Sequence, residues 1–388
     1  MLITGAALLS LLIWLYLLLA RGAFWRVGAV APAAAIGRAS QSSVAVIVPA
    51  RNEAAVVGES VRSLLSQTGA HGVHVFLVDD GSTDTTAQIA RAAAVHAGKP
   101  EALTIISGAE LPQGWSGKVW AMEQGLERAQ VHAPDFYLFT DADVVHAPDS
   151  IATLITIAGN GPYDLVSFMV KLHCGSFAEK LLVPAFVFFF FMLYPPKWIA
   201  DGRRKVAGAA GGCILLRRES LERASGLAPI RGEIIDDCAL AARIKAAGGR
   251  LWLGLSAGAR SVRPYEGFAG IGRMISRTAF NQLGHSSLML VVSLVGLALV
   301  YLAPPLFLFS NSLISRFCGA AACIAMVAAY LPTVRFYRLT PFWALTLPAA
   351  ALFYIGATFH SAYRFWAGQG GEWKGRVQDP QRKKYLKL

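Results

Sequence analysis

Two short acidic turns contain the residues of this chain best placed to do chemistry. One apolar run leads into Asp79 and Asp80, and a second one, residues 136–140, leads into Asp141 and Asp143. Carboxylates at the ends of apolar strands are costly unless cations or hydrogen-bond donors face them. In an open α/β sheet, ligands bind at this end of the strands, and an Asp-x-Asp turn suits Mg²⁺ or Mn²⁺ held against phosphate oxygens. The two turns therefore predict an enzyme that handles a nucleotide diphosphate, with Asp141 and Asp143 at the metal and the diphosphate.

Further small and polar residues are candidates for the same ligand site. The loop after the first strand contains Pro49 and Glu53, which are candidates to bind a nucleobase edge; the alternative is an ordinary strand–helix loop. Lys118 begins a predicted helix and is a candidate to neutralise phosphate, the alternative being a solvated lysine. Gly211 and Gly212 precede a strand, where they permit either close approach of a ligand or a packing-driven bend.

An acidic pair later in the chain is the candidate proton acceptor. Asp236 and Asp237 follow apolar residues and open a predicted helix, so one carboxylate can be held poised to accept a proton. Alone, the same pattern is a helix start with favourable acids. Arg273 and Arg277 share a helix face and can brace a leaving diphosphate, or serve as charges flanking a membrane segment. His146 is expected to be a solvated loop residue rather than a further metal ligand.

The elements that must position these residues alternate between strands and helices. Strands are predicted at 44–49, 74–78, 103–106 and 136–140. Helices are predicted between them: one with an apolar face over residues 56–65, one beginning near Ser82 and one over residues 118–129. This alternation predicts a three-layer α/β domain.

The composition places part of the chain in a membrane. Hydrophobic residues make up 55% of the sequence and the mean hydropathy is +0.47, which exceeds the usual value for a soluble domain. Residues 6–20 are apolar, and because no Lys or Arg precedes them and no small-residue cleavage site follows, they are predicted to be an uncleaved anchor. Three candidate spans of about 20 residues follow at 286–309, 317–334 and 341–362. Residues 181–194 are too short and Pro-interrupted to span, which favours an interfacial helix over a buried core helix.

Charge and cysteine content add to this picture. The net charge is +12, and residues 364–388 contain seven basic and two acidic residues, which predicts contact with lipid headgroups rather than with nucleic acid. Arginines after the anchor place the central region on the cytoplasmic side. Three C-terminal spans would then put the basic tail outside, so either one apolar block is re-entrant or the rule fails here. The five cysteines lack metal-ligand spacing and predict neither a zinc site nor disulfides, as in a reducing cytosol.

Six motifs, in this order, resemble those of family 2 glycosyltransferases of the GT-A fold. They read VIVPARNE, VDDGSTD, GKVWAMEQGL, TDADV, GGCILLRR and IDDCALAARI, and they cover about residues 44–280. One N-terminal anchor and a C-terminal hydrophobic block are similar to the ceramide-glucosyltransferase-like branch, and especially to bacterial glycosyltransferases associated with hopanoid biosynthesis.

The resemblance implies roles for individual residues. It implies that Asp79 and Asp80 contact the nucleoside of a nucleotide-sugar. It likewise implies that Asp141 and Asp143 hold Mg²⁺ or Mn²⁺ on the diphosphate, and that Asp237 is the base.

The chain departs from the family pattern at two motifs. Glu123 stands where the family usually has Asn, and the family's Gln-x-x-Arg-Trp motif keeps only Arg277. In processive relatives the tryptophan of that motif binds the acceptor sugar. Its absence favours a single transfer to a lipid over polymer synthesis.

Together these expectations define an organisation and a function. The fold class is α/β: a GT-A, Rossmann-like nucleotide-binding domain with an N-terminal membrane anchor and C-terminal transmembrane helices. The boundaries are 1–22 for the anchor, 23–43 for a linker, 44–284 for the glycosyltransferase domain with an interfacial segment at 181–196, 285–363 for transmembrane helices and 364–388 for the basic tail.

The expected activity is inverting transfer of a sugar from a nucleotide-sugar donor to a lipid, a hopanoid or a related molecule. The expected location is the bacterial inner membrane, with several spans and a cytoplasmic catalytic domain. A polyprenyl phosphate or glycerolipid acceptor is an alternative, and a sugar-nucleotide pyrophosphorylase or a non-catalytic membrane scaffold are alternatives of another class.

Overall fold

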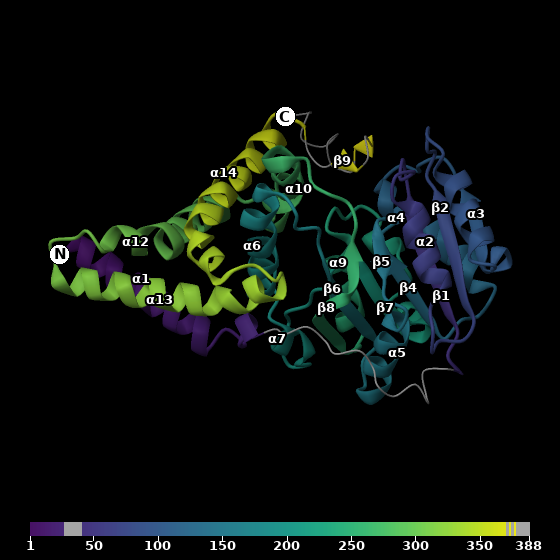
Figure 1. Cartoon of the computed structure of the whole chain (residues 1–388), viewed down its shortest axis with the longest axis horizontal. Coiled ribbons are helices and arrows are strands. Elements are labelled where there is room, and N and C mark those ends of the chain that lie inside the picture. Colours follow the sequence, from purple (N-terminus) through teal and green to yellow (C-terminus); the bar gives the residue numbers. More distant parts are fainter. Residues whose placement is uncertain (27–40, 370–371, 374–375, 378–388) are drawn as a thin grey trace. The chain divides into compact units, whose positions relative to one another are not determined.

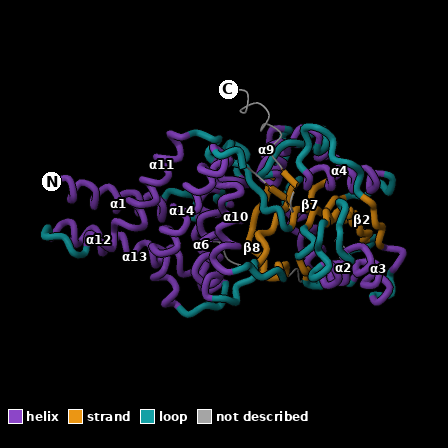
Figure 2. The backbone as a smooth tube through the Cα atoms, turned by 90° about the horizontal axis from the view of Figure 1, so that it is seen from above, coloured by secondary structure: helices purple, strands orange, loops and turns teal. Residues whose placement is uncertain are grey.

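The computed structural model describes residues 1–26, 41–369, 372–373 and 376–377, so most of the predicted linker and of the basic tail lies outside the described residues. The chain divides into two compact units (Figures 1 and 2). The helical unit comprises Met1–Gly28, His173–Trp198 and Pro264–Gly370, and the sheet unit comprises Ala29–Leu172, Ile199–Arg263 and Gly371–Leu388.

The sheet unit is built on one eight-stranded mixed sheet. Its strands are β1 (Val44–Ala50), β2 (Val73–Asp79), β3 (Leu103–Ser107), β4 (Phe136–Thr140), β5 (Val144–His146), β6 (Leu165–Lys171), β7 (Cys213–Arg217) and β8 (Leu251–Ser261). They lie in the order β3-β2-β1-β4-β7-β6-β8-β5. The first four are parallel, β7 is antiparallel to both of its neighbours, β8 is parallel to β6, and β5 is antiparallel to β8.

The four predicted strands are confirmed as β1 to β4. All seven residues of β1 and all five of β4 are buried, because neighbouring strands pair on both edges and helices cover the faces. Both strands end at the sheet edge from which the acidic turns emerge. The prediction of a sheet that carries these turns at its carboxyl end is therefore confirmed.

Helices cover this parallel part of the sheet on both faces. The helices of the sheet unit are α2 (Val57–Leu65), α3 (Thr86–His96), α4 (Gly117–Gln130), α5 (Ser150–Asn160), α8 (Arg218–Arg223) and α9 (Asp236–Ala246). The buried face of α2 packs with Val46 and Val48 of β1, whereas Ile47 points to the opposite face, against Gly125 of α4. The three-layer prediction is confirmed here. Helix α3 begins at Thr86 rather than near Ser82.

The helical unit contains the long apolar helices. They are α1 (Leu2–Leu19), α6 (Phe177–Leu193), α10 (Gly267–Gln282), α11 (Ser287–Leu297), a π-helical turn (Ala298–Leu302), α12 (Ala303–Phe307), α13 (Leu313–Phe336) and α14 (Leu347–Trp366). A 3-10 turn (Pro341–Thr346) precedes α14, and the short helix α7 (Pro196–Ala200) follows α6.

Within the described residues, five helical stretches are long and apolar enough to cross a membrane. They are Leu2–Leu19, Phe177–Ala200, Ser287–Phe307, Leu313–Phe336 and Pro341–Trp366. Four of them correspond to the predicted anchor and spans. The fifth contains residues 181–194, so the expectation that this segment is too short to span is wrong: a capping box at Ser176 and Glu179 starts the helix earlier than the apolar run itself.

We predict that Gly125→Ala destabilises the protein. A Cβ at this position would lie 2.7 Å from Cγ2 of Ile47 and 3.1 Å from Cγ2 of Val78, so α4 must move away from the sheet, at a cost of about 1–3 kcal/mol. Gly159→Ala on α5 is the matched control, because a Cβ there meets nothing within 4 Å and the helix gains propensity. Thermal unfolding of the purified protein measures both; equal stability of the two variants would contradict the packing argument.

Candidate functional site

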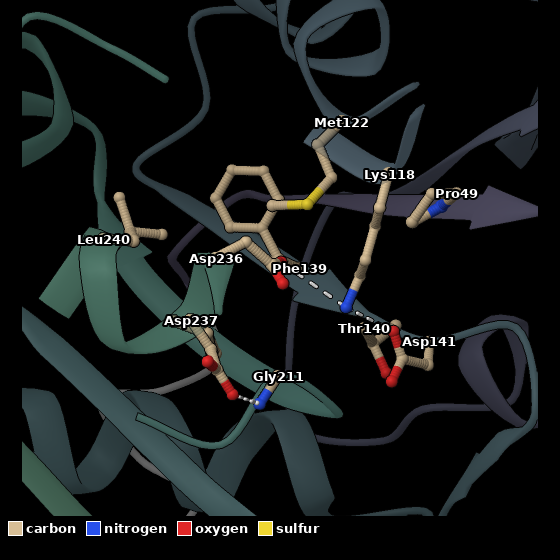
Figure 3. Close-up of a pocket in the computed structure, with 11 residues that line it drawn as sticks. Pro49, Lys118, Met122, Phe139, Thr140, Asp141, Gly211, Asp236, Asp237 and Leu240 are labelled. Carbon is tan, nitrogen blue, oxygen red and sulfur yellow. Dashed lines mark hydrogen bonds and ion pairs between the residues drawn. The ribbon is translucent and has the colours of Figure 1, made fainter. Parts of the chain in front are cut away.

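A polar pocket lies where β1, β4 and the start of α9 meet. It is lined by Pro49, Lys118, Met122, Phe139, Thr140, Asp141, Gly211, Ile214, Asp236, Asp237 and Leu240 (Figure 3). Six of the predicted site residues are in this set. They come from five separate places in the sequence, which the sheet order and the packing of α4 and α9 bring together.

Lys118 is the cation at the centre of this pocket. Its Nζ lies 3.0 Å from Oδ1 of Asp141 and 3.5 Å from Oδ2 of Asp236 (Figure 3). Burial alone would lower the pKa of Lys118, but the two carboxylates outweigh burial and raise that pKa above its ordinary value. Lys118 is therefore a fixed positive charge that joins the turn after β4 to the start of α9, and the alternative of a solvated lysine is wrong.

Asp237 is held by backbone amides at the other side of the pocket. The N–H of Gly211 donates to its Oδ2 at 2.8 Å, and the N–H of Cys238 donates to its Oδ1 at 2.7 Å. Burial and the neighbouring charge of Asp236 raise the pKa of Asp237 to about 6, although Lys118 and the two amides favour its charged form. A carboxylate of this basicity can accept a proton near neutral pH.

A second polar cluster holds the other carboxylate of the Asp-x-Asp turn. The Nε of Arg263 lies 3.3 Å from Oδ2 of Asp143, and the hydroxyl of Ser261 donates to the same oxygen at 2.9 Å. Arg263 also forms an ion pair with the buried Glu53. The turn thus directs Asp141 towards Lys118 and Asp143 towards Arg263.

Sequence reasoning missed Arg263 altogether. It follows β8, a strand that was not predicted. Without that strand, nothing in the local sequence marks a single arginine as a site residue. The ion pair shows that Glu53 and Asp143, 90 positions apart, converge on one guanidinium at this edge of the sheet.

The first acidic turn is bound to the loop after β1. Arg51 lies 3.6 Å from Oδ2 of Asp80 and also donates to the carbonyl of that residue, so the buried Asp80 carboxylate anchors the loop. Oδ1 of Asp79 accepts the N–H of Ser82 at 2.9 Å, which closes the turn. Asp79 is half-buried and sits at the end of β2, so contact of this turn with a nucleoside stays a prediction.

Two of the remaining predicted residues have other surroundings. Gly212 is packed against Val170, and its carbonyl accepts the hydroxyl of Thr140 at 2.8 Å, which supports the packing alternative for this glycine. Arg277 is an exposed residue of α10 in the helical unit, so its part in donor binding stays a prediction.

The carboxylates fit one kind of metal site. Among the described residues, no group of three or more His, Cys, Asp or Glu side chains could hold an ion without help. The side chains of Asp141 and Asp143 are 37% and 19% exposed, and their oxygens are hard ligands. They therefore suit a divalent ion that takes one or two carboxylates and completes its shell with phosphate and water oxygens.

His146 differs from its expected state. It lies on β5 and is buried, with Nε2 3.0 Å from the hydroxyl of Thr140 and Nδ1 3.3 Å from that of Ser150. Burial lowers the pKa of His146 to about 4. The prediction of a solvated loop histidine is wrong, because the strand that carries it was not recognised.

Comparison with known proteins finds a similarity to one family in this part of the chain. Residues 45–224, somewhat less than half of the chain, match the model of glycosyl transferase family 2. This segment contains the two acidic turns, Lys118 and Gly211, while Asp237 and Arg263 lie beyond the matched residues.

The relatives support the family domain and the fold. A 4,4'-diaponeurosporenoate glycosyltransferase of Staphylococcus aureus (strain bovine RF122 / ET3-1) is 33% identical over 118 residues, which cover 30% of this chain and only 28% of that protein. Among solved structures, the mannosyltransferase PcManGT of Pyrobaculum calidifontis, in complex with GDP-Man and Mn²⁺, aligns over 93% of this chain and 99% of its own, with 21% identity and a TM-score of 0.55. The chain thus has a mixed α/β, GT-A-like fold.

We predict that His146 makes the sheet unit sensitive to acid. Its folded pKa of about 4 lies below the ordinary 6.5, so the unfolded chain binds a proton first and stability falls as pH drops from about 6.5 to 4. The loss should reach roughly 2–3 kcal/mol. His146→Gln should remove this pH dependence, whereas substitution of the exposed His96 should keep it. Denaturant unfolding at several pH values measures the slope, and an unchanged slope in His146→Gln would contradict the assignment.

Proposed function

We propose that this protein is a membrane-associated, inverting glycosyltransferase that moves a sugar from a nucleotide-sugar to a lipid hydroxyl. The observation that carries the proposal is the pocket itself: a basic carboxylate, Asp237, faces a fixed cation, Lys118, within one pocket continuous with Asp141. A pyrophosphorylase or a scaffold would not need a carboxylate held at this basicity beside the diphosphate site.

The relatives support a nucleotide-sugar donor and an apolar acceptor. The staphylococcal relative is named for a carotenoid acid, and the archaeal mannosyltransferase holds GDP-Man and Mn²⁺. The five apolar helical stretches among the described residues support a membrane-associated enzyme, for which a lipid is an accessible acceptor. We infer a hopanoid or a related lipid as acceptor, with a polyprenyl phosphate or a glycerolipid as the alternative.

The proposed mechanism gives each of these side chains a role. Asp237 accepts the proton of the acceptor hydroxyl while that oxygen attacks the anomeric carbon. The bond from that carbon to the diphosphate oxygen breaks, and the electron pair leaves with the nucleoside diphosphate. Because one displacement occurs from the opposite face, the configuration of the anomeric carbon inverts.

The remaining residues stabilise the charge that develops on the leaving group. Lys118 is held by two carboxylates and presents a preorganised positive charge to the diphosphate. Asp141 and Asp143 would hold Mg²⁺ or Mn²⁺, which when bound supplies further positive charge to the diphosphate. Gly211 has no side chain, and its N–H orients the Asp237 carboxylate towards the pocket.

We predict that Asp237→Asn lowers sugar transfer by about 10²–10⁴-fold while donor binding persists, because only the proton acceptor is lost. The assay incubates the detergent-solubilised protein with radiolabelled nucleotide-sugars, Mn²⁺ or Mg²⁺ and bacterial lipid extract, and follows label into the organic phase. In the wild type, kcat/KM should rise with pH through about 6, where Asp237 loses its proton. Glu127→Gln, on the exposed side of α4, should behave as wild type; retained transfer in Asp237→Asn would contradict the role.

We predict that Asp143→Asn weakens binding of Mn²⁺ in the presence of a nucleoside diphosphate. The substitution removes one hard anionic ligand, and Asp141 alone leaves the ion with fewer protein oxygens. Electron paramagnetic resonance of Mn²⁺ measures the bound fraction, with UDP and GDP as probes. Asp149→Asn, at the start of α5, is the control. Equal Mn²⁺ binding by wild type and Asp143→Asn would rule out this carboxylate as a ligand.

A further inference from the structure

Helix α6 cannot cross the membrane, although it is long and apolar enough to do so. It lies in the chain between β6 and β7, which are adjacent antiparallel strands in which Leu165 pairs with Leu216. A crossing at α6 would put these two strands on opposite sides of the bilayer. The chain could return only through residues 201–212, which form no helix and could not lie in hydrocarbon.

Helix α10 runs beside α6 in the same direction. At their beginnings the rings of Phe177 and Phe268 are 6.4 Å apart, and at their ends the hydroxyl of Tyr194 donates to Oε1 of Gln282 at 2.9 Å. Arg273 and Arg277 are exposed in the middle of α10, where a crossing helix would place them in hydrocarbon. Helix α10 therefore lies at the same depth relative to the membrane as α6.

Helix α14 is bound to α10 along its length. Near their starts, the rings of Phe268 and Phe353 are 5.8 Å apart. Further on, the buried hydroxyl of Ser361 donates to the carbonyl of Ser276 at 2.5 Å and accepts the N–H of Phe280 at 3.0 Å. The carbonyl of Ser276 and the N–H of Phe280 are four residues apart, the spacing of one α-helical hydrogen bond. The hydroxyl of Ser361 therefore bonds to both partners of one such pair in α10.

The three helices thus form one parallel layer. Helix α14 also contacts α6, because the hydroxyl of Tyr354 donates to the carbonyl of Leu182 at 3.1 Å and its ring lies 4.9 Å from that of Phe189. Since α6 cannot cross and the others run beside it in the same direction, none of the three crosses.

The other long helices have a different arrangement. The indole N–H of Trp14 donates to the carbonyl of Val300 at 2.8 Å, and Thr4 contacts Ser312 and Ser315 by hydroxyl hydrogen bonds. Helix α1 is therefore antiparallel to the segment 287–307 and parallel to α13. In Figure 1, α1 and α13 lie side by side and extend away from α6 and α14, which run across them.

We propose that only α1, the segment 287–307 and α13 cross the bilayer, while α6, α10 and α14 lie in the lipid–water interface on the side of the sheet unit. Three crossings put the end of α14 on that side. The partner of the layer is the lipid surface: α14 exposes Tyr363 and Trp366, aromatic residues typical of an interface, and α10 exposes its two arginines.

The distribution of charge agrees with this topology. The ends of the crossing helices near the layer carry Arg21, Arg26, Arg335 and Arg338. At the far ends, the loop 308–312 has no charged residue and the first turn of α13 carries only Arg316. The positive-inside tendency is then satisfied at both ends of the crossing helices. The proposal thus removes the conflict between three C-terminal spans and the positive-inside rule, because α14 lies in the interface and neither crosses nor re-enters.

Cysteine labelling of the full chain in spheroplasts tests the proposal. Asn311→Cys, in the far loop, and Gln369→Cys, after α14, are treated with a membrane-impermeant maleimide, and the wild-type chain with its five cysteines gives the baseline. We expect Asn311→Cys to be labelled in intact spheroplasts. Gln369→Cys should be labelled above the wild-type baseline only after the membrane is permeabilised. Labelling of Gln369→Cys from outside, or of Asn311→Cys only after permeabilisation, would overturn the topology.

Reporter fusions give a second measurement that does not depend on cysteine reactivity. Green fluorescent protein fused after Leu388 should be fluorescent, and alkaline phosphatase at the same position should be inactive. The reverse pattern would show that α14 crosses. Neither readout depends on sugar transfer, so failure of the proposed activity leaves this test intact.

Discussion

The ion pairs of Lys118 are the interaction on which the functional site depends. Asp141 begins the turn after β4 and Asp236 begins α9, and one ammonium group lies within 3.5 Å of both carboxylates. Without that charge, three carboxylates would converge in a half-buried pocket, where their mutual repulsion is poorly screened. The arrangement explains why Gly125 matters at a distance: close packing of α4 on β1 and β2 sets where its first turn delivers Lys118.

Local sequence pattern was sufficient for the parallel half of the sheet and for the residues that follow its strands. Continuous apolar runs end in acidic turns, and burial on both faces forces such runs into a central sheet. The other half was not accessible in this way. Strands β5 and β8 are short or interrupted by small and polar residues, so their pattern is weak, and Arg263 and His146 depend on them.

Hydropathy alone does not decide which helices of the helical unit cross a membrane. A window of apolar residues measures only how favourable it is to remove those residues from water. Burial in lipid and burial against a neighbouring helix both satisfy this tendency. Helix α14 buries Ser361 and Ala362 against α10, and α6 buries three of its six phenylalanines, so much of their apolar surface is already covered by protein. In the topology proposed above, the side of the membrane that each loop occupies is inferred from the pairing of β6 with β7, which no window of the sequence contains.

The cluster around Arg263 has an electrostatic consequence for the order of binding. Around the pocket and this cluster stand two cations, Lys118 and Arg263, and five carboxylates from Glu53, Asp141, Asp143, Asp236 and Asp237. Even with Asp237 protonated, the region is negative. A diphosphate without a bound cation carries two negative charges and is repelled by this edge of the sheet. A diphosphate that already holds a divalent cation is not repelled. In the proposed mechanism, capture of the donor therefore depends on the divalent cations in solution, before any chemistry begins.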